Sequence, residues 1–440
     1  MIHCVLLLTS LLAGQVEKPA GEELKSDVRR LVRQLDAAQL AQREAAEAEL
    51  LKRGPAILDL LPQPSDRQSA EVRQRLGRIR QKLQQLAADN TARSSTITLR
   101  ADDMPLSKIL MEFQRQSGNM IVDQRGKRGD GEPEVPSPTL KVNFNKTPFW
   151  QALDQLADQA ELGVSPFTEK AAISLTTLPN GGILLLNGTL PTARVPRVGR
   201  ACYSGPFRFE VASVVARRDF RPLPRGALSV NVEIAWEPRL RIIGLTQRMA
   251  DVKAVDGRGN PLPVADDEAQ LEIPTSGDAA AVELNLPLQL PSRDVRRVAS
   301  LKGRLLAMIP GRIETFRFDN PAKAKNVEKR IAGVTVTLEG VSKNNDVWEM
   351  RVLVHFDDAG DALASHRTWI FNNDAHLEGP DGKAIAYDSF ETTAQEKNEV
   401  GVAYLFNTDQ PLDKLTFVYK TPGTIVNSGF DYELKNVELP

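Results

Sequence analysis

Residues 96–176 constrain the fold of this 440-residue chain more than any other segment, because they run through one pattern twice. Each half starts with alternating apolar residues, enters a helical pattern next to a proline, and ends in a short apolar run. The first half spans Ile97 to Val122 and the second spans Leu140 to Val164. Alternation with period two is typical of a strand, and apolar spacings of three and four are typical of a helix. The segment therefore predicts a small αβ module, which offers a docking surface and carries no evident catalytic chemistry.

The two predicted helices share an opening proline and an apolar face. Met104-Pro105-Leu106 and Thr147-Pro148 begin them, since proline is well tolerated near the first helical position. The apolar positions are Leu106, Ile109, Leu110 and Phe113 in the first helix, and Phe149, Ala152, Leu153, Leu156 and Ala157 in the second.

These motifs resemble the STN module, the short N-terminal domain of secretins and of TonB-dependent outer-membrane receptors. The resemblance is carried by Ile97-Thr98-Leu99-Arg100-Ala101, Met104-Pro105-Leu106, Phe113-Gln114-Arg115-Gln116-Ser117-Gly118 and Met120-Ile121-Val122, and then by Leu140-Lys141-Val142-Asn143-Phe144, Thr147-Pro148 and Leu162-Gly163-Val164. It implies a βαβ-βαβ domain over residues 96–178 that docks onto protein partners in the periplasm. No secretin pore segment follows, so only the adaptor character carries over to this chain.

The N-terminus predicts export. Residues 5–14 form an apolar run of signal-peptide length that is too short to span a bilayer. Ala13-Gly14 suits cleavage before Gln15, although the preceding residues contain no lysine or arginine. We therefore expect a signal peptide at 1–14, a periplasmic or extracellular mature protein, and no integral membrane segment. Cys202 would then be the single cysteine, and we expect it to be a small packing residue.

Residues 22–92 predict a helical leader. Leu24, Val28, Leu31 and Leu35 recur at spacings of 4, 3 and 4. Residues 35–54 look like one HEAT-type helical repeat that stops at Gly54-Pro55. One repeat cannot bury its own core, so we expect a helical hairpin or packing on another domain. The last helix carries a basic set that we interpret as a solvated face: Arg73, Arg75, Arg78, Arg80, Lys82 and Arg93.

From about Gly181 onward, short alternating runs are separated by glycine, proline and Asp-Gly turns. The runs lie at 207–215, 228–234, 282–290, 334–338, 348–356, 404–406 and 415–419. Such runs are typical of half-buried antiparallel strands, and many of them together favour β-sandwiches. We expect one β-sandwich at 181–295 and a second at 298–440, joined by a hinge at 291–297.

Patterns for catalysis and metal binding are weak. The chain has a net charge of −1, so no overall basic field favours nucleic acid as a partner. Neither a Gly-x-Ser-x-Gly elbow nor a phosphate-binding glycine loop occurs. His355, His366 and His376 are spaced by 11 and 10 residues, which matches no zinc signature, although facing strands could still join His355 to His376.

Three oxygen-rich segments raise the question of calcium: 256–260, 266–268 and 371–374. None has the ligand order of an EF-hand, so we interpret them as turns.

Together these patterns predict an α+β multidomain protein with an N-terminal helical hairpin, a βαβ-βαβ module and two antiparallel β-sandwiches. We expect an exported bacterial envelope protein that acts without catalysis, as a docking or scaffolding factor for a protein partner. Binding would use sheet edges or exposed strand faces, and no catalytic, cofactor-binding or metal-binding residues are assigned. The alternative is a metal-dependent or carbohydrate-active enzyme with a site near His355, His366 and His376. A third hypothesis is a structural spacer with no saturable partner.

Overall fold

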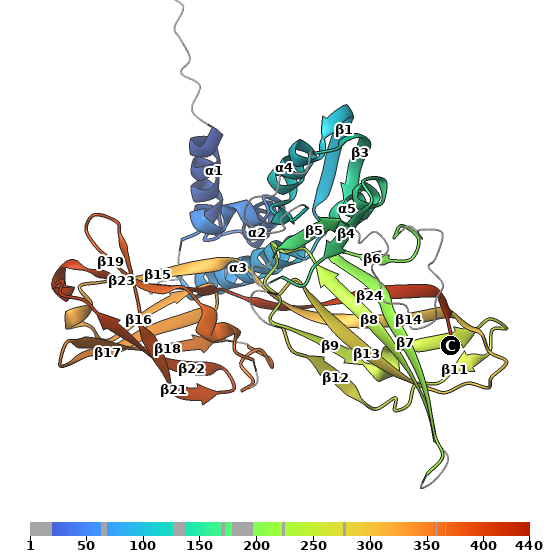
Figure 1. The fold of residues 1–440 in the computed structure, drawn as a ribbon. Coiled ribbons are helices and arrows are strands. Elements are labelled where there is room, and N and C mark those ends of the chain that lie inside the picture. The colour runs from blue at the N-terminus through green and yellow to red at the C-terminus, as the bar shows by residue number, and fades with distance from the viewer. Residues whose placement is uncertain are drawn as a thin grey trace, which may run out of the picture. The chain divides into compact units, whose positions relative to one another are not determined.

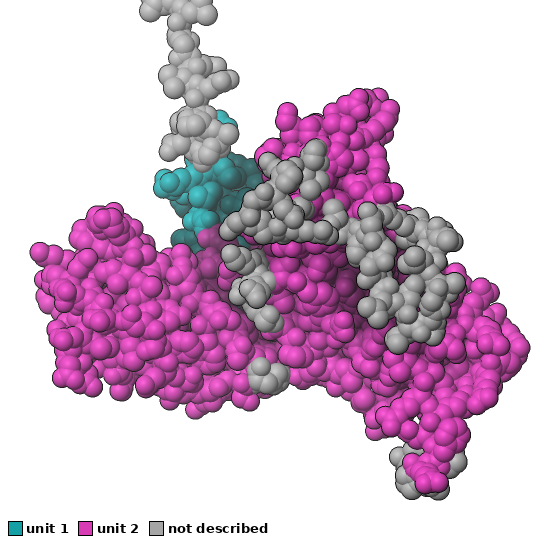
Figure 2. All heavy atoms as spheres, in the orientation of Figure 1, with its two compact units in different colours: residues 1–86 teal, residues 87–440 magenta. Residues whose placement is uncertain are grey.

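A computed structural model describes residues 20–62, 68–125, 137–168, 172–177, 197–221, 225–275, 279–357, 359–365 and 367–440. The chain divides into two compact units, residues 1–86 and 87–440 (Figure 2). The expected signal peptide at 1–14 lies outside the described residues. No helix in the described part of the chain has the length and apolar character that crossing a bilayer requires. The described elements are mostly strands in several antiparallel sheets, with few helices.

The first unit is helical. It contains α1 (Ala20–Gln34), α2 (Leu40–Lys52), the short 3-10 helix η1 (Pro55–Leu60) and most of α3 (Ala70–Thr91). Gly54 has a φ of 74° and follows the end of α2, as the Gly-Pro pair predicted. The fully buried side chains of this helical unit are Val28, Leu35, Leu50, Ile57, Leu76, Ile79 and Leu83.

Two arginines of α3 are buried, so the prediction of a solvated basic face on this helix is wrong for them. Arg75 is 8% exposed and its guanidinium lies 2.7 Å from Glu47 on α2, and Arg80 is 9% exposed and donates to the carbonyl of Leu61. A buried guanidinium needs an anionic or carbonyl partner, and both arginines have one. They hold the helices of this unit together instead of facing water.

An αβ module opens the second unit (Figure 1). Its elements are β1 (Thr96–Pro105), α4 (Leu106–Ser117), β2 (Ile121–Asp123), β3 (Thr139–Pro148), α5 (Phe149–Gln159), β4 (Leu162–Ser165) and β5 (Ile173–Thr177). Strand β1 pairs antiparallel with β3, and the second sheet has the order β2-β5-β4 with β2 parallel to β5. Both helices begin directly after their prolines, so Pro105 and Pro148 occupy the N-cap position, where they make no side-chain capping hydrogen bond.

Two sheets follow and enclose one apolar core. The first has the order β13-β8-β7-β6, with β6 (Cys202–Ser204), β7 (Phe207–Asp219), β8 (Arg225–Trp236) and β13 (Ala281–Gln289). The second contains β9 (Gly244–Arg248), β10 (Lys253–Asp256), β11 (Pro261–Leu262), β12 (Gln270–Ile273), β14 (Arg297–Pro310) and β24 (Ile425–Glu438), with the short helix η2 (Met249–Asp251) after β9. Alternate side chains of both sheets point inward, among them Val230, Val232, Leu301 and Leu305.

Two further sheets enclose a second core, which contains Phe316, Val352 and Phe417. One has the order β15-β23-β19-β20, with β15 (Ile313–Asp319), β23 (Thr416–Pro422), β19 (Ala375–Glu378) and β20 (Ala384–Ala386). The other has the order β16-β17-β18-β22-β21, with β16 (Lys325–Ile331), β17 (Val334–Asn344), β18 (Val347–Phe356), β22 (Glu399–Asn407) and β21 (Ser389–Glu396). Short 3-10 helices lie at η3 (Pro321–Lys323), η4 (Trp369–Asn372) and η5 (Leu412–Lys414).

The C-terminal strand differs from the expected layout. We expected a hinge at 291–297 and a separate sandwich from residue 298 onward. Strand β14 instead pairs with β9 and β10 of the first pair of sheets, and β24 returns to pair with β14 from Arg297–Glu438 to Pro310–Ile425. The chain therefore leaves the first core after Pro310 and re-enters it at Ile425, because Phe430, Tyr432 and Leu434 bury their side chains there.

Candidate functional site

The Phe-x-x-Gln-Ser-Gly motif closes helix α4 and ties it to the neighbouring strands. Phe113 is fully buried, and Ser117 donates to the carbonyl of Phe113 (2.6 Å) while accepting from the amide of Asn119 (3.1 Å). Gly118 has a φ of 71°, the left-handed conformation that ends many helices. Gln116 pairs with the backbone of Thr98, accepting from its N–H at 2.8 Å and donating to its carbonyl at 3.0 Å. Each residue of the motif thus has a structural contact in this module.

A buried carboxylate joins the end of this motif to the first pair of sheets. Glu237, just after β8, is fully buried. It accepts from the amide of Ser95 at 2.8 Å, from the Asn119 side chain at 3.1 Å and from Arg239 Nε at 2.7 Å. Asn119 in turn accepts from the amide of Arg239 at 3.0 Å. Every oxygen of Glu237 is therefore satisfied, as a buried charge requires.

A second ionic cluster fixes α5 to the outer face of β7 and β8. Asp154 of α5 is fully buried, and its Oδ2 lies 2.8 Å from Arg208 Nε and 2.7 Å from the hydroxyl of Tyr203. Arg208 also contacts Glu210 and lies 3.1 Å from Glu233. Burial raises the pKa of Asp154 above its ordinary value, although Arg208 opposes this effect. Burial lowers the pKa of Arg208, but Asp154 and Glu210 outweigh it, so its pKa lies above the ordinary value and the guanidinium stays charged.

Apolar contacts complete this junction. Ala235 of β8 and Ala281 of β13 belong to the apolar core of the αβ module. Trp150 is 2% exposed and donates from Nε1 to the carbonyl of Pro206 at 3.1 Å. The module and the sheet β13-β8-β7-β6 therefore form one continuous packed body within the second unit.

The β1–β3 ribbon, residues 96–105 and 139–148, packs one face on the core of the αβ module and exposes the opposite face to solvent. Its inward side chains include Leu140, Val142 and Phe144, which alternate with exposed residues. On the exposed face Lys141 lies 2.7 Å from Asp102. Within the described residues β3 pairs only with β1, so its other edge has no strand neighbour. The corresponding edge of β1 is covered at Thr98 by Gln116, as described above.

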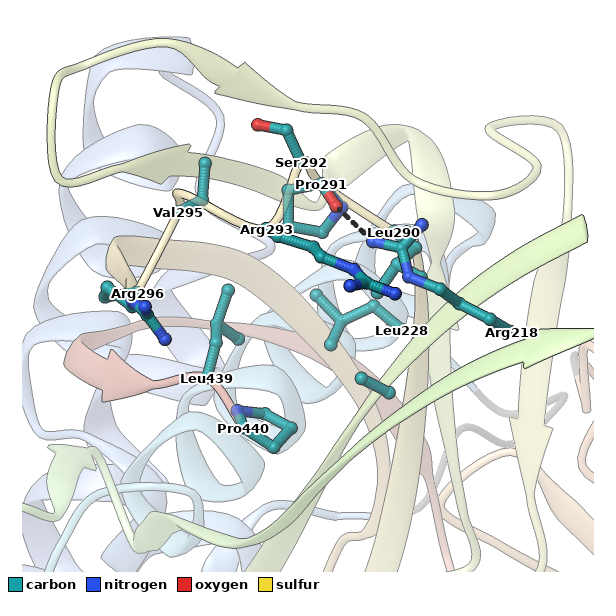
Figure 3. Close-up of a pocket in the computed structure, with 11 residues that line it drawn as sticks. Arg218, Leu228, Leu290, Pro291, Ser292, Arg293, Val295, Arg296, Leu439 and Pro440 are labelled. Atoms are coloured by element: carbon teal, nitrogen blue, oxygen red, sulfur yellow. Dashed lines mark hydrogen bonds between the residues drawn. The ribbon is translucent and has the colours of Figure 1, made fainter.

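A pocket of about 310 Å³ lies at one end of the first pair of sheets (Figure 3). Leu228, Leu290, Val295 and Leu439 give it apolar walls, and three arginines, Arg218, Arg293 and Arg296, surround it. The guanidinium of Arg218 donates to the carbonyl of Pro291 at 3.2 Å. The volume of the pocket is at the lower end of the range for small-ligand sites, about 300–1,000 Å³.

The acidic residues beside this pocket are engaged elsewhere. Asp219 pairs with Arg217 at 2.8 Å, and Asp294 pairs with Arg258 at 2.7 Å. The Ser292 hydroxyl, backbone hydrogen bonding and Arg258 hold the pKa of Asp294 below its ordinary value. Across the described ranges, no ion pair neutralises the three pocket arginines, Arg218, Arg293 and Arg296. The pocket therefore places three arginines that have no ion pair within the described ranges beside a few apolar side chains, an arrangement that favours an anion.

The histidines do not converge in the described structure. His355 on β18 lies between the inward-facing Val354 and Phe356, and His376 on β19 lies between the inward-facing Ala375 and Leu377. Because side chains alternate along a strand, the two rings lie on the outer faces of two different sheets, with the core between them. His366 lies outside the described residues. The facing-strand arrangement that a metal site would need is therefore contradicted for His355 and His376.

The oxygen-rich segments use their oxygens within turns. Asp256 accepts from the amides of Arg258 (2.8 Å) and Asn260 (2.9 Å), which is the geometry of a turn residue. Asp266 accepts from the amide of Glu268 at 3.0 Å, and Asp374 lies 2.8 Å from His376. Within the described ranges, no group of three or more His, Cys, Asp or Glu residues is placed to hold a metal ion.

Cys202 is partly buried against the first core, and its sulfur accepts from the amide of Glu433 at 3.4 Å. This position agrees with a packing role.

Sequence analysis missed the arginine pocket, although one signal was visible: the run Arg217-Arg218-Asp219-Phe220-Arg221 places an aromatic residue among three arginines. The remaining arginines come from a different segment, so their convergence depends on the sheet topology.

Comparison with known proteins gives no relative: no family model, no curated protein and no solved structure matches this chain.

Proposed function

We propose that this protein is an exported bacterial envelope protein that binds a protein partner without catalysis, as a docking or scaffolding factor. The observation that carries the proposal is the ten-residue strand β3, which has one edge without a strand neighbour among the described residues. An edge strand exposes backbone N–H and C=O groups that can pair with a strand of another chain. The STN-like interpretation of residues 96–178 is part of this proposal, because that resemblance implies docking.

The way in which the β1–β3 ribbon is attached to the rest of the second unit supports docking at the edge of β3. Asp154, Arg208 and Glu237 are almost completely buried where the αβ module meets the sheet β13-β8-β7-β6. A rigidly held edge loses less conformational entropy on binding than a mobile one. The charged side chains of Asp102 and Lys141 on the outer face of the ribbon disfavour unspecific pairing of its unpaired edge.

Position-specific photocrosslinking tests the proposal. A photoreactive side chain at Asn143, exposed on β3, is compared with one at Thr392, exposed on the edge strand β21. We expect a discrete adduct from position 143 whose yield saturates with protein concentration, and none of the same size from position 392. The variant Lys141→Glu, which places the opposite charge beside the edge, should reduce that adduct severalfold.

Equal adducts from both positions, or an adduct that Lys141→Glu leaves unchanged, would reject docking at β3. An absence of any saturable adduct would favour the structural spacer.

A further inference from the structure

Residues 215–221, at the far end of β7 and just after it, include exposed apolar and basic side chains. Phe220 is 74% exposed, which makes it the most exposed large apolar side chain of the described residues, and Val215 is 52% exposed. Arg217, Arg218 and Arg221 flank Phe220 in the sequence. Figure 1 shows the ends of β7 and β8 extending beyond the other strands of their sheet. Single exposed apolar side chains are common on protein surfaces, so Phe220 gains significance from the arginines that accompany it.

The arginine pocket adds charge to the same end of the sheets. Arg218 of the hairpin lines the pocket together with Arg293 and Arg296, which belong to the connection between β13 and β14 (Figure 3). Asp219 and Asp294, the nearest acids in the sequence, are paired with Arg217 and Arg258. Arg218, Arg293 and Arg296 have no ion pair within the described ranges, so they add positive charge at this end of a chain whose net charge is −1.

We infer that this end of the second unit binds the surface of an anionic phospholipid bilayer. The guanidinium groups of Arg218, Arg293 and Arg296 suit phosphate oxygens, which arginine holds with paired hydrogen bonds. The ring of Phe220 enters the boundary between headgroups and acyl chains, where interfacial segments bury apolar side chains such as phenylalanine. An acidic peptide would satisfy the arginines but would leave the projecting Phe220 without a role. A bilayer surface accommodates both.

This inference is independent of docking at β3, because the two surfaces belong to different parts of the second unit. The hairpin end belongs to β7 and β8, whereas β3 belongs to the αβ module. Loss of lipid binding would therefore leave the proposed protein docking intact, and the reverse also holds.

Vesicle co-sedimentation of the full chain tests the inference. We expect binding to phosphatidylcholine vesicles that contain phosphatidylglycerol, weaker binding at high salt, and no binding to phosphatidylcholine alone. Each of Arg218→Gln, Arg293→Gln and Arg296→Gln should weaken binding about fivefold, the usual contribution of one basic residue at an anionic surface. Phe220→Ser should weaken it by about tenfold, since the buried ring is lost.

Matched control variants distinguish vesicle binding at this site from non-specific binding by other exposed aromatic or basic residues. Phe167, 49% exposed, and Arg200, exposed in the turn before β6, lie in other segments, so Phe167→Ser and Arg200→Gln should leave vesicle binding unchanged. In the variant Phe220→Trp, the tryptophan emission should shift to the blue when phosphatidylglycerol vesicles are added. Unchanged binding of Phe220→Ser and of the arginine variants would overturn the inference. Stoichiometric binding of a polyglutamate peptide that displaces the vesicles would also overturn it, in favour of an acidic protein partner.

Discussion

Arg208 Nε lies 2.8 Å from Asp154 Oδ2, and the two side chains, 54 residues apart in the sequence, are 4% and 0% exposed. Arg208 projects from the outer face of a strand whose neighbouring side chains, Phe207 and Phe209, are fully buried in the first core. The same short strand segment therefore serves two purposes. It fills the core on one side and holds helix α5 on the other.

Breaking this pair should destabilise the second unit strongly. We expect Arg208→Ala to lower the free energy of unfolding by about 3–5 kcal/mol, because it leaves the buried Asp154 without a cation, and Asp154→Ala to cost less, because Arg208 keeps Glu210 and Glu233. The double variant Asp154→Leu/Arg208→Met should recover much of this loss, since it removes both charges and keeps volume. Urea denaturation of the three variants measures the effect. A double variant as unstable as the sum of the singles would show that the two charges are not coupled.

The same cluster should give a pH dependence of defined sign. Burial raises the pKa of Glu233 above its ordinary value of 4.5, with Arg208 acting in the opposite direction. A raised pKa in the folded state means that this group contributes stability below pH 4.5, and that the contribution is lost as pH rises through the folded pKa. Glu233→Gln cannot ionise, so its free energy of unfolding relative to the native chain should increase over that interval. A constant difference, or one that falls with pH, would contradict the burial effect.

Gln116 should protect the edge of β1. Its side-chain amide occupies both the N–H and the carbonyl of Thr98, so Gln116→Ala leaves two backbone groups open to water. We expect a loss of about 1–2 kcal/mol in stability and faster hydrogen exchange at the Thr98 amide. Gln114→Ala is a matched control on the same helix, since Gln114 accepts only a long 3.4 Å bond from Ile121. Exchange at Thr98 that responds equally to both substitutions would rule out this specific role for Gln116.

A side chain at Gly244 should force Arg367 to move. A Cβ at Gly244 would lie 1.6 Å from Arg367 Nη1, and Arg367 is itself buried at 7% exposure. We expect Gly244→Ala to cost about 1–3 kcal/mol, the range for overpacking in a well-packed site. The double variant Gly244→Ala/Arg367→Ala should cost little more than Arg367→Ala alone, as thermal unfolding can measure. Fully additive losses would mean that the close approach does not limit this position.

Local patterns predicted much of the fold because their causes are local. The alternation at 282–290 gives β13, and the apolar spacing from Leu106 to Phe113 gives α4. Strand β24 was harder to place, because its partner β14 lies far away in the sequence and no local signal specifies that pairing. For the same reason the sequence did not reveal that Arg218 and Arg293 share a pocket, or that His355 and His376 face away from each other.

Buried charges were also outside the reach of pattern analysis. The arginines of α3 look like a solvated face in the sequence, because helical spacing does not show that Glu47 lies opposite Arg75. The resemblance to an STN module did direct attention to the Phe-x-x-Gln-Ser-Gly motif. Its contacts explain that motif physically, through the cap at Gly118 and the bond from Gln116 to Thr98.

Hydrogen exchange at the backbone amides of β3, measured with and without the captured partner, tests the central claim most directly. Strand addition predicts that outward-facing amides between Thr139 and Pro148 become protected in the complex, while amides of the edge strand β21 keep their rates. Unchanged exchange along β3 in a saturated complex would contradict docking at this edge.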